Sequence, residues 1–312
     1  MAPYSGILLC EKSYGISSHK TINQLRQIMG QKKIGHTGTL DPRATGLLVL
    51  CLGRATKIAQ FLSDFDKSYD ATVRLGQSSP TYDSEGISPD DKPQPVPDLS
   101  ENDINEILDK FRGRIKQKVP PFSAVKVNGE KLYKLARRGE NVELPEKDIE
   151  IKNIELVGIK LPEINLRIDC SKGTYIRTLA HDIGREIGCG AYLSALVRTR
   201  IGPYKLEDAL SVNQIKHYRD AGKLKGQIRP IESVLQFPWL KVHEEFSPHI
   251  LTGRPPRLKD ISEMGGSFEV DELISLKDHN DMIVAVGRAG MDSGQLNEED
   301  NRDFFKYVRV LN

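Results

Sequence analysis

The sequence predicts an α+β fold and not a doubly wound α/β sheet. Segments with the two-residue alternation of strands and segments with the apolar spacing of helices follow one another without a regular strand–helix–strand repeat. The chain has 312 residues, of which 38% are hydrophobic and 28% are charged. This length is sufficient for two domains, and this composition can bury a sizeable core.

The first elements follow from local patterns. Residues 6–12 form a short apolar strand. Ser17 or Ser18 can cap a helix that Gly30 ends. The apolar residues of this helix share one face: Ile22, Leu25, Ile28 and Met29. Residues 45–53 are uniformly apolar and short, which predicts a buried strand or core segment, and residues 55–63 predict a second short helix.

Residues 67–76 alternate cleanly, so Tyr69 lies on the apolar face of a strand, where core packing is its simplest role. Residues 85–99 are rich in proline and form a surface connection. A helix then starts with the capping-box pair Ser100 and Asp103 and ends at Gly113. Its apolar face is made of Ile104, Ile107, Leu108 and Phe111.

A strand over residues 163–170 leads through a short turn into a helix over residues 174–187. Tyr175 and Arg177 therefore lie in the first turn of a helix that directly follows a strand.

Two prolines and a change of character at residues 229–242 indicate a boundary between a domain over residues 1–235 and a small β domain over residues 240–312. The second region contains nine Lys or Arg and fourteen Asp or Glu. Attraction to a polyanion is therefore not expected to be its main contribution.

Positive charge is concentrated in residues 110–139, which contain ten Lys or Arg and a single acid, Glu130. Such a run is more often a solvated face than a binding site. Here the charge is almost unopposed and is interleaved with Phe122 and Tyr133, as in surfaces that bind a phosphate backbone. Nucleic acid is therefore the expected partner.

The four cysteines (Cys10, Cys51, Cys170 and Cys189) have apolar or strand-like neighbours and no CxxC spacing, which argues against a zinc site, disulfides or redox chemistry. No apolar run approaches the roughly 18 residues of a membrane span, and the first residues lack the pattern of a signal peptide. We therefore expect a cytoplasmic protein without a membrane partner.

The motif GHTGTLDPRATG spans residues 35–46. It matches neither the GxxxxGK(S/T) spacing of nucleotide-binding loops nor the GxGxxG spacing of dinucleotide-binding loops. One interpretation is a turn scaffold, in which glycines at 35, 38 and 46 permit backbone angles that other residues avoid. The other is a rigid mount for a nucleophilic or basic carboxylate, Asp41. Arg177 is a candidate to keep that carboxylate ionised, and His36 either contacts the substrate or completes the loop. The paired carboxylates of ordinary glycosidases are not visible.

Five blocks together resemble the TruB family of bacterial tRNA pseudouridine-55 synthases. They are GHTGTLDPRATG with LLVLCLGRATK, DKSYDATVRLG, SAVKVNGEKLYKLARRG, and CSKGTYIRTLAHDIGREIGCGAYLSALVRTRIGPY. The resemblance covers roughly residues 5–235, and the tail is weakly similar to a PUA-like domain. Arg43 stands where the family often has Leu or Met, so contacts at the rim of the site are expected to differ while catalysis does not.

The resemblance implies the pseudouridine synthase fold, a mixed and largely antiparallel sheet flanked by helices. It implies that Asp41 is the catalytic aspartate, that Tyr69 packs against the target base, and that Arg177 pairs with Asp41. The uridine pocket would be completed by His36, Tyr175 and Leu196, although a leucine in this context would otherwise be a core residue.

The basic segment corresponds to the family's thumb, residues 114–146, which closes over the T arm of tRNA. Its expected RNA contacts are Lys126, Lys131, Tyr133, Arg137 and Arg138.

The implied reaction is isomerisation of the uridine at position 55 in the T loop of tRNA to pseudouridine, by a monomer that needs no cofactor, metal or protein partner. The base must first be flipped out of its stack. Three alternatives remain from the sequence: a guide-RNA-dependent, dyskerin-like synthase, a tRNA-binding folding chaperone, and a nucleoside hydrolase.

Overall fold

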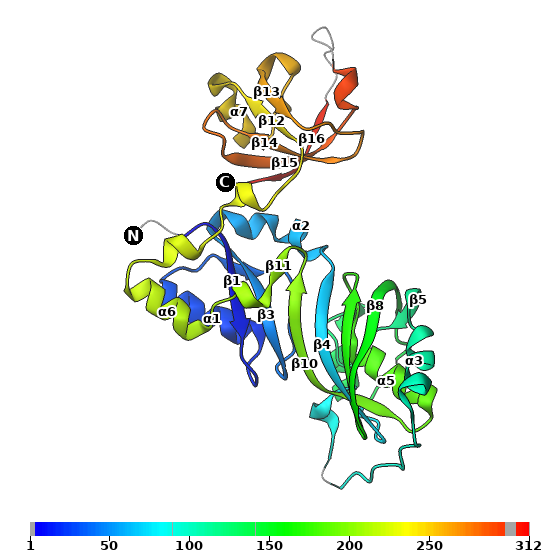
Figure 1. Ribbon diagram of the computed structural model, residues 1–312. Helices are drawn as coiled ribbons and strands as arrows, with labels where there is room; N and C mark the ends of the chain where they lie inside the picture. The colour runs from blue at the N-terminus through cyan, green and yellow to red at the C-terminus, as the bar shows by residue number, and fades with distance from the viewer. Residues whose placement is uncertain (1–3, 89, 141, 297–303, 312) are drawn as a thin grey trace.

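The computed structural model describes residues 4–88, 90–140, 142–296 and 304–311. Within them the strands form one large sheet, one small sheet and a two-stranded hairpin. Figure 1 shows the large sheet and its helices in the lower part of the molecule and the small sheet above them. The predicted α+β class is confirmed.

The large sheet has nine strands within the described residues, in the order β1-β3-β10-β4-β9-β8-β5, with β2 paired to β3 and β11 to β10. The strands are β1 (Gly6–Lys12), β2 (Ile34–His36), β3 (Ala44–Leu52), β4 (Lys67–Leu75), β5 (Gly113–Lys118), β8 (Glu146–Lys160), β9 (Glu163–Cys170), β10 (Ala191–Ile201) and β11 (Tyr204–Lys205). Neighbours are antiparallel except β3 and β10, which are parallel. The expected mixed, largely antiparallel sheet is confirmed.

Helices cover the sheet in two groups (Figure 1). The α-helices are α1 (Ser18–Met29), α2 (Ala59–Ser63), α3 (Glu101–Asp109), α4 (Leu132–Arg137), α5 (Ile176–Ile187), α6 (Val212–Asp220) and α7 (Ser247–Leu251). Apolar residues of α1 and α6 pack against β1 and β3, whereas those of α3 and α5 pack against β4, β9 and β8. No helix in the described residues is long and apolar enough to cross a membrane.

Burial on both faces explains why residues 45–53 are uniformly apolar. Leu48 and Leu50 of β3 belong to the core cluster under α1 and α6, while Leu47 and Val49 belong to a different cluster on the opposite face. A strand with two buried faces cannot show the polar alternation of a half-exposed strand. The prediction of a buried strand is confirmed.

The alternation in β4 has the opposite cause, because the apolar core covers only one face of this strand. Tyr69, Ala71, Val73 and Leu75 are buried as expected. On the other face, side chains directly opposite one another on β4 and β9 are paired through polar contacts: Ser68 with Asp169, Asp70 with Arg167, Thr72 with Asn165, and Arg74 with Glu163.

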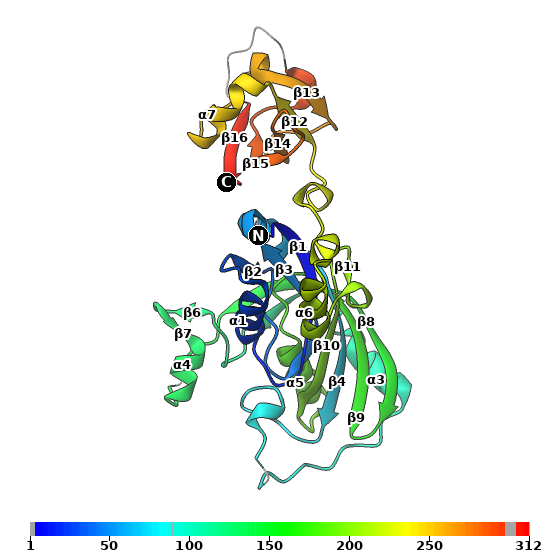
Figure 2. The ribbon, with the colours of Figure 1, turned by 90° about the vertical axis from the view of Figure 1, so that its left-hand side faces the viewer.

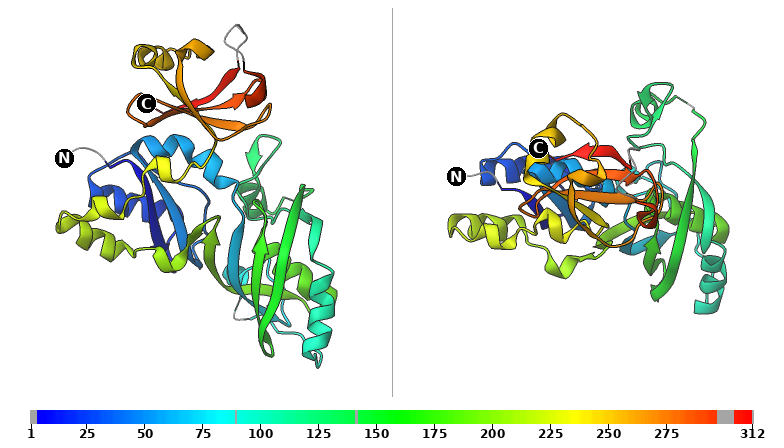
Figure 3. Two further views of the ribbon diagram at one scale, coloured as in Figure 1. Left: turned by 45° about the horizontal axis from the view of Figure 1, so that its top comes forward. Right: turned by 90° about the horizontal axis from the view of Figure 1, so that it is seen from above.

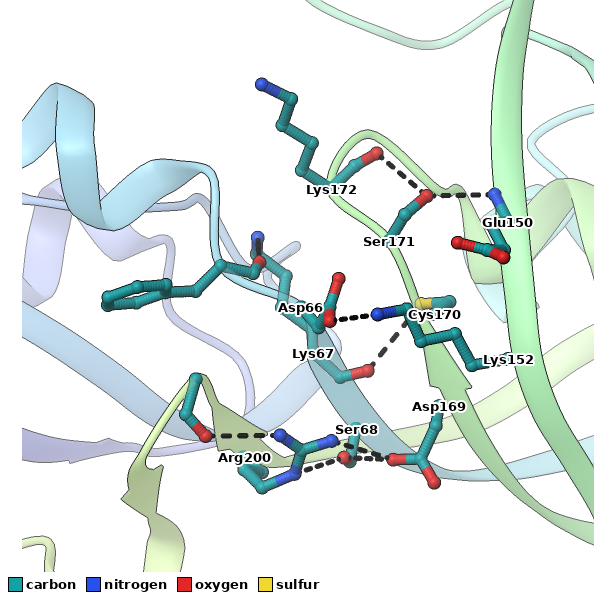
Figure 4. A network of polar contacts seen from close by, with 12 residues as sticks. Asp66, Lys67, Ser68, Glu150, Lys152, Asp169, Cys170, Ser171, Lys172 and Arg200 are labelled. Atoms are coloured by element: carbon teal, nitrogen blue, oxygen red, sulfur yellow. Dashed lines mark hydrogen bonds and ion pairs between the residues drawn. The ribbon is translucent and has the colours of Figure 1, made fainter. Parts of the chain in front are cut away.

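Polar contacts also tie together the ends of the strands that carry the candidate site. Figure 4 shows Arg200 of β10 donating to Ser68 of β4 and pairing with Asp169 of β9. In the same network Lys152 of β8 pairs with Asp66 just before β4, at 2.5 Å. These contacts fix the relative positions of β4, β9 and β10.

The helix predicted to end at Gly113 ends at Asp109 instead. Its capping box at Ser100 and Asp103 is present as expected. Gly113 has a φ of +84° and is the first residue of β5. The glycine therefore begins a strand and does not end the helix. The first basic residues of the thumb therefore alternate along a strand of the large sheet.

Between β5 and β8 the thumb leaves the sheet, and Figure 2 shows this part, in green, projecting to one side of the molecule. It contains the hairpin of β6 (Lys126–Val127) and β7 (Glu130–Lys131), followed by α4. Its small core is formed by Val119, Leu132 and Leu135.

The tail forms the small sheet, in the order β13-β12-β14-β15-β16. Its strands are β12 (Trp239–Val242), β13 (Ile261–Gly265), β14 (Leu273–Lys277), β15 (Ile283–Ala289) and β16 (Phe305–Val310). The four cysteines are buried, as expected.

The small sheet packs on the large one through a shared apolar cluster. Ile283, Val286 and Leu311 belong to the same cluster as Leu47 and Val49 of β3. Figures 1 and 3 both show the light-blue segment of residues 53–63 next to the small sheet. From this segment Arg54 donates to the carbonyl oxygens of Leu311, at 2.7 Å, and of Ile283, at 2.8 Å.

Replacing Arg54 by Met should weaken this junction. Two carbonyl oxygens would lose a charged donor, which corresponds to about 1–3 kcal/mol of unfolding free energy. Urea unfolding of the wild type and of Arg54→Met measures the difference. Arg167→Met, which removes an exposed cation from the sheet face, is the matched control, and equal stability of the two variants would contradict the prediction.

Candidate active site

A cavity of about 580 Å³ lies where the large sheet, the loop that carries Asp41 and the thumb meet. Asp41, Tyr69, Tyr175, Arg177 and Leu196 line it, and the thumb contributes Tyr133 and Arg137. With the segment that contains Asp83, six separate segments of the sequence converge on one space. The described residues that line it do not include His36, Lys126, Lys131 or Arg138.

The floor of the cavity is formed by residues of paired strands in the large sheet. Leu196 of β10 is paired with Ala44 at the start of β3 on one side and with Ala71 of β4 on the other. Tyr69 is two residues from Ala71 along β4 and is 7% exposed. Burial raises the pKa of the Tyr69 hydroxyl. The ring therefore forms an apolar surface in the cavity.

The Asp41 carboxylate is held by an arginine on the opposite wall. Its Oδ2 lies 3.0 Å from Nε of Arg177, whose side chain is 9% exposed, while that of Asp41 is 44% exposed. The carboxylate therefore has one side on a buried cation and one side open to the cavity.

Arg177 has three further partners besides Asp41. Its Nη1 donates to the Thr81 carbonyl at 3.0 Å and lies 3.7 Å from Oδ2 of Asp83, and its Nη2 donates to the Phe122 carbonyl at 3.1 Å. Asp83 also lines the cavity. Asp83 could not be predicted as a site residue, because an aspartate in a turn has no distinguishing sequence pattern.

The loop around Asp41 is anchored by two buried cations, which no sequence pattern predicted. Arg198, 1% exposed, donates to the carbonyl oxygens of Gly38, Thr39 and Leu47. Lys12, with no exposed surface, donates to those of Pro42, at 3.3 Å, and Ala44, at 2.6 Å. No carboxylate in the described residues lies within 4.0 Å of either cation, so backbone carbonyl dipoles solvate them.

Only one of the three glycines in this motif has a backbone conformation that favours glycine. Gly46 has a φ of +103°, and a Cβ there would lie 2.4 Å from the Arg198 carbonyl oxygen. Gly35 and Gly38 do not have positive φ, and a Cβ at either would make ordinary contacts. The expectation of special backbone angles at all three glycines was wrong for two of them.

His36 lies at the end of β2, outside the lining of the cavity. Burial lowers its pKa, and the nearby charges of Arg198 and His19 act in the same direction. Its Nδ1 is buried without a protein partner. Arg43 lies at the cavity mouth and donates to the Ser84 hydroxyl at 3.0 Å.

The thumb residues differ in their partners. The ring of Tyr133 has Lys131 and Arg137 within 5.7 Å and 5.6 Å of its centroid. Arg138 instead pairs with Glu130 at 2.7 Å and Glu140 at 2.6 Å. The charge of Arg138 is therefore largely satisfied within the thumb, whereas Arg137 faces the cavity.

Comparisons with known proteins agree with this architecture. A model described as "TruB family pseudouridylate synthase (N terminal domain)" matches residues 26–176, and one described as "tRNA pseudouridylate synthase B C-terminal domain" matches residues 177–236. Fold and matches together define a pseudouridylate synthase, an isomerase that converts uridine to pseudouridine in RNA. The chain belongs to the TruB family of these enzymes, as the sequence predicted.

Curated relatives carry the name tRNA pseudouridine synthase B. That of Pseudomonas fluorescens is 39% identical over 92% of both chains, and that of Francisella tularensis is 47% identical over 74% of this chain and 76% of its own. Similar solved structures include an H/ACA RNP bound to a substrate RNA and a Cbf5-Nop10-Gar1 complex. The TM-score is 0.74 for both, with 23% and 25% identity over 98% of this chain and 85% of theirs.

The buried Lys12 makes stability depend on pH. Burial lowers its pKa to about 8; the Asp41 charge raises it and that of Arg198 lowers it further. Between this value and about 10.5, the ordinary lysine pKa, the unfolded chain binds the proton that the folded protein has released. The unfolding free energy of the wild type should therefore rise by up to about 3 kcal/mol relative to Lys12→Met across this range.

Urea unfolding of both proteins at pH 7.5 and pH 10 tests this prediction. Comparing the two proteins removes the contributions of other groups that titrate in the same range. A stability difference that stays constant between the two pH values would show that Lys12 keeps its ordinary pKa.

Proposed function

We propose that this enzyme isomerises the uridine at position 55 in the T loop of tRNA, with Asp41 as the catalytic carboxylate. Membership of the TruB family and the printed name of the curated relatives support tRNA as the substrate. One observation carries the assignment of Asp41: it is a half-exposed carboxylate in the cavity, held at 3.0 Å by a buried arginine.

The reaction retains every heavy atom of the uridine. The N1–C1′ bond breaks, the base turns within the cavity, and C5 forms the new bond to C1′. C5 then loses its proton to solvent, and N1 takes up a proton, so the product is an isomer of uridine. Flipping the nucleotide out of its stack costs on the order of a few kcal/mol. Contact of the base with Tyr69 offsets part of this cost, because stacking on an aromatic ring contributes about 1–3 kcal/mol.

In this proposal the base lies between Tyr69, Tyr175 and Leu196, and Asp41 approaches it from the loop side. The cavity volume lies within the roughly 300–1,000 Å³ typical of small-molecule sites. His36 would reach the nucleotide only if RNA binding changes the loop, because in this structure it lies outside the cavity lining.

Two basic surfaces would hold the RNA backbone. One is the thumb, through Lys126, Lys131, Tyr133 and Arg137. The other lies near the junction with the small sheet, where the pKa of Lys57 is lowered by burial and by the charges of Lys33, Arg309 and Arg54. Phosphates would relieve the mutual repulsion of these cations. We further propose that the protein acts as a monomer without a guide RNA or protein partner.

Asp41→Asn should abolish the reaction. The amide has nearly the same shape but cannot act as a base or nucleophile, so release of tritium from a T-arm hairpin labelled at C5 of uridine 55 should fall by at least roughly a thousandfold. Asp70→Asn is the matched control, because it makes the same change on the exposed face of β4. The assay contains no other RNA or protein.

The outcomes of this assay distinguish the candidate functions. Tritium release by Asp41→Asn would contradict the role of Asp41. A wild type that is inactive on the bare hairpin would favour a guide-dependent synthase, and free uracil among the products would indicate a hydrolase.

Arg137→Met should weaken RNA binding more than Arg138→Met. Arg137 lines the cavity, whereas Arg138 is neutralised by two glutamates. A lost phosphate contact raises Kd and reduces the slope of log K against log salt by about 0.9. Hairpin binding measured at 50–300 mM salt tests the pair, and equal effects of the two variants would exclude this division of roles.

A further inference from the structure

A buried amide joins the root of the thumb, residues 117–122, to the wall of the active site. Gln117 lies near the end of β5 and is 3% exposed. Its Nε2 donates to the Tyr175 carbonyl at 3.1 Å, and its Oε1 accepts from the Tyr175 N–H at 2.8 Å. The amide therefore uses both of its polar ends on the backbone of one residue.

The surroundings of Gln117 make this contact notable. Arg114, Lys116 and Lys118 on the same strand are exposed, and only Gln117 in this basic stretch turns a polar side chain inward. A buried amide is costly unless it is hydrogen-bonded. Tyr175 is the N-cap residue of α5 and has no side-chain cap of its own. The Gln117 amide fixes the backbone at the point where α5 begins.

A second contact connects the same two segments. Phe122, five residues after Gln117, accepts a hydrogen bond from Nη2 of Arg177 through its carbonyl. The thumb root thus contacts the start of α5 at Tyr175 and at Arg177, and Arg177 is the side chain that pairs with Asp41. Displacement of the root would move both Tyr175 and Arg177 relative to Asp41.

We propose that Gln117 is a positioning residue that couples the seating of the thumb to the Asp41–Arg177 pair. When the thumb binds RNA, the position of the thumb root changes. The two hydrogen bonds of the Gln117 amide make the backbone of Tyr175 follow that change. Catalysis then depends on Gln117 although its side chain touches neither the RNA nor the reacting atoms. This inference rests on the proposed function, because its readout is the isomerisation of uridine.

Gln117→Glu provides the test. A carboxylate at this position accepts from the Tyr175 N–H but cannot donate to the Tyr175 carbonyl, whereas the protonated acid does both. Burial disfavours the carboxylate, while Lys147 on the paired strand β8, Lys116 and Lys118 on β5 itself, and Arg177 favour it. Tyr175, whose backbone makes both hydrogen bonds, is a titratable residue at the start of α5, and Glu146 and Asp148 flank Lys147 on β8.

The expected result is a kcat about 10- to 100-fold below wild type at pH 8, as for a small misplacement of catalytic groups. The ratio of the variant's kcat to that of the wild type should rise as the pH is lowered toward 5.5. Gln117→Met, which makes neither hydrogen bond, should show the loss without the recovery. Kd for the hairpin should change less than threefold in both variants.

The chain contains a matched control. Gln31 is also buried and makes the same reciprocal pair of hydrogen bonds, to the backbone of Tyr4, away from the cavity. Gln31→Glu makes the same chemical change in the same kind of contact, so it should leave kcat and its pH dependence within about twofold of wild type.

Three outcomes would overturn the inference: wild-type kcat for Gln117→Glu at pH 8, a loss that does not recover as the pH falls, or a raised Kd with unchanged kcat. Thermal unfolding of each variant checks that it is folded. In the pH series, the kcat ratio of a variant at pH 5.5 is compared with the ratio of the same variant at pH 8. Absence of tritium release by the wild type would refute the proposed function instead.

Discussion

The guanidinium of Arg177 is the contact on which the arrangement of the site depends. It joins the Asp41 loop, the segment of Thr81 and Asp83, and the thumb root at Phe122, three regions that no regular element connects directly. Because a guanidinium has five donors in a fixed plane, it sets the directions of these segments as well as their distances. Loss of this one side chain would remove the shared polar contacts that hold the three segments together.

The loop that carries Asp41 obtains its rigidity from charges placed beneath it. Arg198 and Lys12 are buried without a carboxylate partner among the described residues, and both donate to carbonyl oxygens of the loop and its flanks. Burying a cation is costly unless it is fully hydrogen-bonded, so the loop can adopt only conformations that present these oxygens. Lys12 also lies close enough to Asp41 for the charge of that carboxylate to raise the lysine pKa, against the larger effect of burial.

Much of the fold and part of the site could be predicted from local patterns. The alternation of residues 67–76 placed Tyr69 on the buried face of β4, and the capping box at Ser100 located the start of α3. The end of α3 could not be predicted in the same way. The helix ends at Asp109, and Gly113 begins β5, which pairs with β8, a strand more than thirty residues later. Arg198 and Gln117 could not be predicted for a similar reason, because their partners are far away in the sequence.

The sequence by itself determined the class of fold, the family, and the concentration of positive charge in the thumb, because these depend on residue order and local periodicity. Only the tertiary structure decided which cations are free to meet RNA and which are used internally. Arg137 faces the cavity while Arg138 is held by two glutamates, although the two are neighbours in the chain. The physical reason is that a side chain's charge acts through its surroundings, and folding supplies those from distant segments.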